Sequence, residues 1–333
     1  MTMRRNPISP TVDFERDGAH FGHLRLPYSH NNSAWGAILI PICVIRNGTG
    51  PCALFTGGNH GDEYEGPIAL HDLALRLVPD DIQGTVILVP SMNHPAFVAS
   101  ARVSPLDGGN MNRSFPGRPD GGPTEKIADY FQRTLLPMAD IVLDFHSGGR
   151  TLDFLPFAAS HVLDDPAQEA RCRAARDAFN APFSIEMREI DALGMYDDAA
   201  ESMGKTFVTT ELSGGGSARP ETVAIAKKGA RNLLIHAGIL NAEPECAPTR
   251  HLTQPDDACF HFAETEGLVE FVPDLGSIIQ KGDVLAHIWD YRRIGVPPAE
   301  VRAQRDGLLV ARHHPGLVSM GDCLAVLAVE TSD

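Results

Sequence analysis

The chain is organised around one stretch, Cys52-Ala53-Leu54-Phe55-Thr56-Gly57-Gly58-Asn59-His60-Gly61-Asp62-Glu63. Its first five residues form a continuous run typical of a strand buried on both faces. The small residues that follow end this strand and deliver His60 and Glu63 three positions apart. Imidazole nitrogen and carboxylate oxygen are both zinc ligands, and a catalytic zinc usually takes three protein ligands beside a water. The stretch therefore predicts half of a metal site, although a bare His-x-x-Glu is also common in solvated loops.

Size and composition limit what this protein can be. The chain has 333 residues, of which 43% are hydrophobic and 21% charged, so we expect a globular protein of one large domain or two ordinary ones. The net charge of −15 argues against nucleic acid and anionic membrane as partners. No run of 18 apolar residues is present to span a membrane.

Two further features indicate the compartment. The N-terminus is charged but has no apolar segment after it, so we expect no secretory signal. Six cysteines are scattered without a Cys-x-x-Cys pair, which favours buried thiols over a disulfide framework. The sequence thus predicts a reduced, cytoplasmic protein, and we further expect a homo-oligomer.

The hydrophobic pattern alternates between strands and helices up to about residue 240. Strands are predicted at 35–45, 52–56, 84–89, 141–145 and 207–210, and helices at 68–78, 95–101, 124–136, 165–179 and 221–239. Residues 1–33 are polar and rich in turn formers, 107–122 form a long glycine-rich loop, and 183–203 are ambiguous. This alternation predicts an α/β fold, a mostly parallel mixed sheet flanked by helices.

The pattern changes near a proline-rich linker at 241–248, which divides the chain into a catalytic domain at 1–244 and a smaller all-β domain at 245–333. The second part repeats a Gly-Asp turn, at Gly282-Asp283 and again at Gly321-Asp322, which suggests two similar β units. It looks like the biotinyl/lipoyl type of β domain, whose cofactor is carried on a lysine. The available Lys281 does not lie between the repeats, so we expect a structural lid or an assembly module.

Two more polar residues stand at strand ends. His146 follows the strand at 141–145, and Glu211 follows the strand at 207–210, each beside glycines. Alone, His146 could be a satisfied core histidine, and Glu211 could be a salt-bridge acceptor. Because the carboxyl ends of parallel strands meet at one edge of a sheet, we expect both to join His60 and Glu63 there. A carboxylate confined in such a cleft gains a raised pKa and suits a general base.

The order of these residues resembles the succinylglutamate desuccinylase/aspartoacylase family, which belongs with the zinc carboxypeptidase-like fold. The resemblance covers roughly residues 50–240 and rests on His60-x-x-Glu63, Asn93-His94-Pro95-Ala96, Arg102, Asn112-Arg113-Ser114-Phe115-Pro116-Gly117, Asp144-Phe145-His146-Ser147 and Glu211. Within that family the sequence looks most like bacterial deacetylases that act on N-acetyl-2,4-diaminobutyrate in ectoine degradation.

The resemblance assigns roles to particular residues. It implies one zinc per chain on His60, Glu63 and His146, with Glu211 activating the water. It further implies that Arg102 polarises the scissile carbonyl and that Asn112 and Arg113 hold a substrate carboxylate. One departure stands out, because the family's Asp-x-Asn-Arg begins here with Asn110. Asn110 would be the hydrogen-bond acceptor behind a zinc-bound histidine, without the charge of an aspartate.

The sequence therefore predicts a zinc-dependent amidohydrolase that deacetylates a small N-acyl amino acid. A carboxypeptidase and an aspartoacylase or succinylglutamate desuccinylase type of deacylase are the alternatives within the class. A metal or small-molecule binding protein and an acyl-carrier module are the alternatives outside it. A substrate with one carboxylate and one ammonium suits the charged residues that are available. The candidates are Arg113, Arg118 and Arg150 for the carboxylate, and Asp191, Asp197 and Asp198 for the ammonium.

Overall fold

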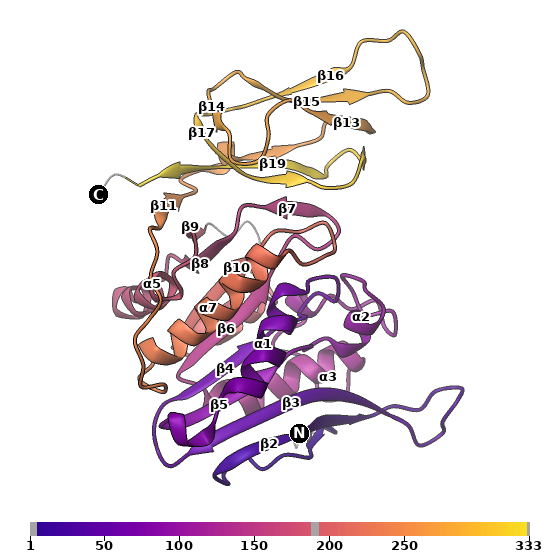
Figure 1. Ribbon diagram of the computed structural model, residues 1–333. Helices are drawn as coiled ribbons and strands as arrows, with labels where there is room; N and C mark the ends of the chain where they lie inside the picture. The colour runs from indigo at the N-terminus through magenta and orange to yellow at the C-terminus, as the bar shows by residue number, and fades with distance from the viewer. Residues whose placement is uncertain (1–4, 188–192, 332–333) are drawn as a thin grey trace.

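The computed structural model describes residues 5–187 and 193–331, which form an α/β body that carries a β-rich C-terminal region (Figure 1). Its helices are α1 Glu65–Arg76, α2 His94–Val98, α3 Pro123–Tyr130, α4 Leu136–Met138, α5 Pro166–Phe179, α6 Tyr196–Glu201 and α7 Pro220–His236. A π-helical turn, Phe131–Leu135, joins α3 to α4, and 3-10 turns lie at Pro79–Asp81, Met111–Arg113 and Asp257–Cys259. Among these described residues, no helix is both long and apolar enough to cross a membrane.

The strands fall into one large sheet and one small sheet. The α/β body contributes β1 Ser9–Pro10, β2 Gly18–Pro27, β3 Ala37–Asn47, β4 Cys52–Thr56, β5 Gly84–Val89, β6 Ile141–His146, β7 Leu152–Phe154, β8 Phe157–His161, β9 Phe183–Met187 and β10 Thr206–Glu211. The C-terminal region contributes β11 Arg250–Thr253, β12 Phe260–Phe262, β13 Gly267–Phe271, β14 Ile278–Ile279, β15 Val284–Trp289, β16 Ala299–Arg302, β17 Gly307–His313, β18 Leu317–Val318 and β19 Cys323–Glu330.

The centre of the large sheet is parallel, in the order β5-β4-β6-β10. Every residue of β4, β5 and β6 is buried, which explains their continuous apolar sequences. Outside this centre the neighbouring strands run antiparallel, with β3 beside β5 and β8 beside β10. The sheet is therefore mixed, and the predicted parallel pairing holds for its centre and again for β8, β9 and β11.

Helices cover both faces of the sheet, as predicted. On one face α1, α5 and α7 pack against the strands around buried side chains such as Phe55, Phe145 and Phe179. On the other face the α3 segment and α6 enclose a second core, in which the Tyr196 ring stacks on Phe115. The strands of the centre are thus fixed from both sides, and their carboxyl ends meet at one edge.

Several strands of the large sheet were not predicted, among them β2 and β8 of the α/β body. β2 lies within the polar segment at 1–33 and pairs with β3 along its whole length, with side chains alternating between buried and exposed positions. β8 is buried but is built of Phe, Ala, Ala, Ser and His, which have no strong strand propensity as a group. Both strands are stabilised by pairing with neighbours rather than by their own sequence. The ambiguous segment at 183–203 contains β9 and α6, with 188–192 outside the described residues.

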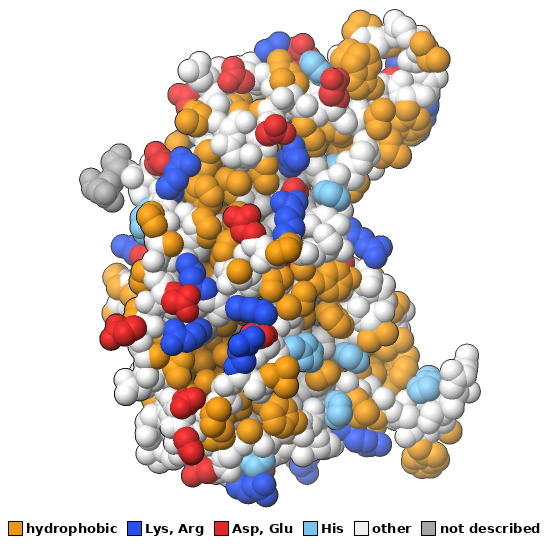
Figure 2. Space-filling view, viewed as in Figure 1, with side chains coloured by type: hydrophobic (Ala, Val, Ile, Leu, Met, Phe, Trp, Pro, Cys, Tyr) orange, Lys and Arg blue, Asp and Glu red, His pale blue; other side chains and the backbone are white. Residues whose placement is uncertain are grey.

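The strands after residue 245 continue the large sheet instead of standing apart from it. β11 pairs in parallel with β9 and antiparallel with β19, and β7 of the α/β body pairs with β17. A second sheet, in the order β16-β15-β13-β18, completes this all-β region. The β2–β3 and β15–β16 hairpins extend on the same side of the molecule, and Figure 2 shows the outline between them hollowed. A domain boundary near residue 245 stays a prediction.

The central strands should carry much of the stability. Phe55 in β4 is fully buried, so Phe55→Ala should lower the free energy of unfolding by about 3–5 kcal/mol, the usual cost of removing a buried phenyl ring. Phe21 on β2 is 64% exposed, so Phe21→Ala should change the free energy of unfolding by only about 0.5 kcal/mol. Urea unfolding of both variants tests this, and equal losses would show that β4 is not the core strand described here.

Candidate metal centre

Four predicted residues meet at the carboxyl edge of the central strands. His60 and Glu63 lie in the turn that follows β4. His146 is the last residue of β6, and Glu211 is the last residue of β10, where the two are register partners. The sheet order β4-β6-β10 makes these strands direct neighbours. The parallel register therefore brings together side chains as far apart in the sequence as His60 and Glu211.

The turn after β4 is held closely against the rest of the body. A Cβ on Gly61 would lie 2.0 Å from the carbonyl carbon of Ala96 in α2, so a larger residue cannot occupy this position. The Gly61 N–H donates to the Ala101 carbonyl at 3.0 Å. The Glu63 carboxylate also accepts the Ser147 N–H at 3.2 Å, which ties the turn to the exit of β6. These contacts leave His60 and Glu63 nearly inaccessible to solvent.

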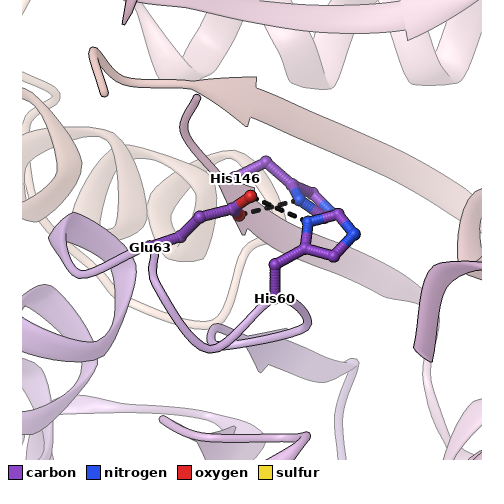
Figure 3. Close-up of side chains that lie close together, drawn as sticks. All are labelled: His60, Glu63 and His146. Atoms are coloured by element: carbon purple, nitrogen blue, oxygen red, sulfur yellow. Dashed lines mark hydrogen bonds and ion pairs between the residues drawn. The ribbon is translucent and has the colours of Figure 1, made fainter. Parts of the chain in front are cut away.

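Glu63 lies between the two imidazoles (Figure 3). Its Oε1 is 2.7 Å from Nδ1 of His60, and its Oε2 is 3.0 Å from Nδ1 of His146. One ligand atom from each of the three residues lies within 4.8 Å of the others. Ligands on a tetrahedral zinc are about 3.4 Å apart when each is about 2.1 Å from the ion. The three side chains therefore fit a metal ion with small rotations, and all three donor types suit zinc.

Asp144 fixes the orientation of His146. Its Oδ2 lies 2.8 Å from Nε2 of His146, and Oδ1 accepts the Thr56 hydroxyl at 2.6 Å. The Asn59 amide donates to the same carboxylate at 2.8 Å. A hydrogen bond from Nε2–H of His146 to Asp144 leaves Nδ1 as the nitrogen that can bind a metal. This buried network selects the tautomer that metal binding needs.

The pKa shifts at the centre reflect a site that stabilises positive charge. Burial would raise the pKa of Glu63, but His60 and His146 outweigh it and hold that pKa well below its usual range. Burial would likewise lower the pKa of His146, yet the Asp144 and Glu63 carboxylates raise it well above the ordinary value. His60 departs from this trend, because burial and the Arg102 guanidinium lower its pKa in spite of the opposing effect of the Glu63 carboxylate. A divalent cation among these groups would meet the same negative field.

Glu211 lies beside this centre, and its carboxyl group has a raised pKa. Burial, followed by the nearby Glu63 carboxylate, raises the pKa of Glu211 to about 8. Its Oε2 is buried and has no hydrogen-bond partner among the described residues. A carboxyl group with a raised pKa that lines a polar cavity can exchange a proton near neutral pH.

These side chains share a cavity of about 170 Å³ with the other predicted residues Arg102, Asn112 and Arg113. Nη1 of Arg102 lies 3.4 Å from Nδ1 of His60 and 3.9 Å from Oε1 of Glu63. Asn112 is buried, and its oxygen accepts the Tyr196 N–H at 3.0 Å. The exposed Arg113 guanidinium donates to the Asn112 carbonyl at 2.6 Å.

Other predicted residues lie outside this cavity. The oxygen of Asn110 accepts the Asn112 N–H at 3.1 Å, while Nε2 of His60 has no partner among the described residues. The acceptor behind His146 is Asp144, while the Asn110 side chain closes its own 3-10 turn. Arg118 pairs with Glu125 at 2.8 Å, away from the centre.

The acidic candidates divide in a similar way. Asp197 lines the 170 Å³ cavity, and it also lines a larger neighbouring cavity of about 570 Å³ together with Asp198. Asp191 lies outside the described residues. The Arg150 side chain lies beside Gly216 rather than in the cavity.

Asp144 was recognised in the sequence as part of a family motif, but no role was predicted for it. The signal was present, because Asp144 is an acidic residue inside an otherwise apolar strand, two positions before His146. Side chains two apart on a strand point to the same face, so the carboxylate and the imidazole had to be neighbours. Asn59 and Thr56, which donate to Asp144, carried no comparable signal, because their partner is remote in sequence.

Fold and site together define an α/β protein with a candidate metal centre of two histidines and one glutamate, beside a second glutamate. Residues 49–237 match the family described as Succinylglutamate desuccinylase/Aspartoacylase catalytic domain, and the chain belongs to this family. It is therefore an enzyme of the amidohydrolase class that acts on a small-molecule substrate, as its sequence predicted.

Similar proteins extend over nearly the whole chain. An N-alpha-acetyl-L-2,4-diaminobutyric acid deacetylase of Halomonas elongata is 54% identical over 98% of this chain and 96% of its own length. The product-bound structure of the Ectoine utilization protein EutE (DoeB) from Ruegeria pomeroyi is 60% identical, with a TM-score of 0.97 over 98% of this chain and 99% of that one. A succinylglutamate desuccinylase from a Silicibacter species is 56% identical, with a TM-score of 0.96 over 99% and 100%.

The Asp144–His146 contact predicts how the metal-free protein titrates. After removal of metal by a chelator, the pKa of His146 should lie well above about 6.5, and Asp144→Asn should lower it by removing the charge. Because the folded pKa exceeds the unfolded one, this stabilisation is complete below about pH 6.5 and is lost as the pH rises through the raised pKa.

Imidazole nitrogen shifts measured by NMR report this titration. His236 provides an internal comparison of opposite sign, because burial lowers its pKa. A His146 that titrates at or below the ordinary value would contradict the proposed pairing with Asp144.

Proposed function

We propose that the protein is a zinc-dependent deacetylase of N-acetyl-L-2,4-diaminobutyrate, which it converts to 2,4-diaminobutyrate and acetate in ectoine catabolism. The observation that carries the proposal is the position of Glu63 between Nδ1 of His60 and Nδ1 of His146, with Glu211 in the same cavity. The 54% identity to a deacetylase of this substrate over nearly the full length supports the same reaction.

His60, Glu63 and His146 would hold one zinc per chain, with a position left for water or substrate. When bound, zinc polarises the amide carbonyl and lowers the pKa of water toward neutrality. Asp144 keeps His146 in the tautomer that presents Nδ1. A metal-storage protein would have no use for Glu211, a carboxylate of raised pKa outside the ligand set, which favours an enzyme over a binding protein.

Glu211 and Arg102, which lie around the zinc site, have separate roles in the proposed hydrolysis. Glu211 takes the proton of the attacking water and passes it to the leaving amine, because its raised pKa suits both transfers. Arg102 stabilises the negative charge that develops on the carbonyl oxygen, and its guanidinium already lies at the edge of the site. The new carboxylic acid leaves as acetate.

The charges of the cavity favour a substrate with one carboxylate and one ammonium. Arg113 presents a planar fork that can bind the carboxylate, and Asn112 fixes the turn that carries it. Asp197 lines the cavity and would face the ammonium. Beyond it, Asp198 and Glu201 line the 570 Å³ cavity, so a second carboxylate in that direction would be repelled.

The β region at 245–333 is proposed as a second domain that shapes this cavity. The pairing of β17 with β7 supports the role, because Leu152 and Phe154 of β7 line the cavity. The Leu155 N–H also donates to the Val310 carbonyl at 2.9 Å. A homo-oligomer and a cytoplasmic location stay predictions.

Metal binding and proton transfer should separate in two variants. Glu211→Gln keeps the size of the side chain and removes its basicity, so kcat should fall by about 10²–10⁴ while zinc stays bound. His146→Ala removes a ligand, so zinc and activity should be lost together. Metal analysis and steady-state kinetics test both. Full zinc occupancy in His146→Ala, or nearly intact kcat in Glu211→Gln, would refute the respective role.

A panel of N-acylated amino acids, followed by release of the free amine, tests the substrate. The value of kcat/KM should be higher for N-acetyl-2,4-diaminobutyrate than for N-acetylaspartate or N-succinylglutamate, because only the first offers an ammonium to Asp197. Arg113→Ala should lower kcat/KM for it by about 10–100-fold, and the matched Arg118→Ala should leave it unchanged. Faster turnover of N-acetylaspartate, or of a peptide as by a carboxypeptidase, would overturn the proposal.

A further inference from the structure

The chain leaves the strand of Glu211 through a residue in an unusual conformation. Ser213 has a φ of 100°, in the region that favours glycine, although three glycines follow it directly. It is almost completely buried. A non-glycine residue in this region is strained, and such residues persist only where the surrounding contacts hold them. The contacts of Ser213 therefore indicate what the strain maintains.

Those contacts come from a buried carboxylate and from two backbone amides. The Ser213 hydroxyl donates to Oε1 of Glu65 at 2.8 Å, and Glu65 is itself almost fully buried. The Ser213 carbonyl accepts the Gly148 N–H at 2.8 Å and the Phe154 N–H at 3.4 Å. A Cβ on Gly148 would lie 2.1 Å from the Leu152 carbonyl oxygen, so this junction has no space in which to shift.

The junction joins all three segments that carry the site. Glu65 lies two residues after Glu63, Gly148 two residues after His146, and Ser213 two residues after Glu211. Neither Ser213 nor Glu65 is among the described residues that line the 170 Å³ cavity. They therefore do not touch the reacting groups, and they act on the reaction through the position of their neighbours, while the Glu65 carboxylate also adds to the raised pKa of Glu211.

We propose that Ser213 and Glu65 are positioning residues for Glu211. The hydroxyl–carboxylate bond fixes the left-handed backbone at Ser213 and so fixes the direction in which Glu211 leaves β10. The inference rests on the proposed function, in which Glu211 is the base. If the role of this junction were purely structural, removing its hydrogen bond would lower stability without changing proton transfer by Glu211.

A double-mutant cycle with Glu211→Gln in the zinc-loaded enzyme separates these two roles. Ser213→Ala should lower kcat by about 10–100-fold, as expected for a small misplacement of a reacting group, with KM and zinc content little changed. In the Glu211→Gln background the same substitution should cost less than about twofold, because the group it positions is already disabled. Equal losses in both backgrounds would overturn the inference. Full activity of Glu211→Gln alone would instead refute the base itself.

Two further variants isolate the hydrogen bond from the backbone strain. Ser213→Gly tolerates the positive φ and lacks the hydroxyl, so it should fold well and lose as much kcat as Ser213→Ala. Glu65→Gln keeps an acceptor oxygen and should retain kcat within about threefold, whereas Glu65→Ala should match Ser213→Ala. A Ser213→Gly variant with the wild-type kcat would overturn the inference.

The chain provides a control for the loss of a serine–carboxylate bond whose serine is buried. The Ser184 hydroxyl on β9 donates to Oδ1 of Asp177 at 2.7 Å, and Ser184 is buried. Ser184→Ala should lower Tm without changing kcat. If Ser184→Ala lowered kcat as much as Ser213→Ala, the effect at Ser213 would be one of general destabilisation, and the inference would fail.

Discussion

The strongest constraint on this structure is a buried polar contact, in which the Glu63 carboxylate lies between Nδ1 of His60 and Nδ1 of His146. Taking a carboxylate out of water costs several kcal/mol unless charged partners and hydrogen bonds compensate for it. The protein supplies two imidazoles, the Ser147 N–H and Arg102 at its edge. Every element that delivers these groups is therefore constrained in position, and a bound cation would satisfy the same constraint.

The sheet meets that constraint with three adjacent parallel strands whose ends lie side by side. Asp144 adds a second buried carboxylate in β6, and its oxygens accept hydrogen bonds from Thr56 and Asn59. Ser213 joins the exits of the three strands through its contacts with Glu65 and Gly148. The C-terminal β region joins the same structure through β7 and β17, so the wall of the cavity and the C-terminal strands of the large sheet form one hydrogen-bonded sheet. Site and fold are thus stabilised by the same contacts.

The sequence was sufficient for the central strands and for the meeting of His60, Glu63, His146 and Glu211, because apolar runs and strand ends are local signals. It was not sufficient for β2 and β8, which depend on pairing with neighbours. The contact between Asp144 and His146 was not predicted, and the only hydrogen bond of the Asn110 side chain among the described residues is with the Asn112 N–H, so its predicted role stays a prediction. Contacts between residues remote in sequence are the part that no local pattern contains.

The central claim is that His60, Glu63 and His146 form a single zinc site. Anomalous diffraction at the zinc edge, from crystals of the zinc-loaded enzyme, tests it most directly. We expect one peak about 2.0–2.2 Å from Nδ1 of each histidine and from the Glu63 carboxylate, with an open position facing the cavity of Glu211. A peak at another cluster, such as the one where Glu201 lies 3.0 Å from His161, with none beside Glu63, would contradict it.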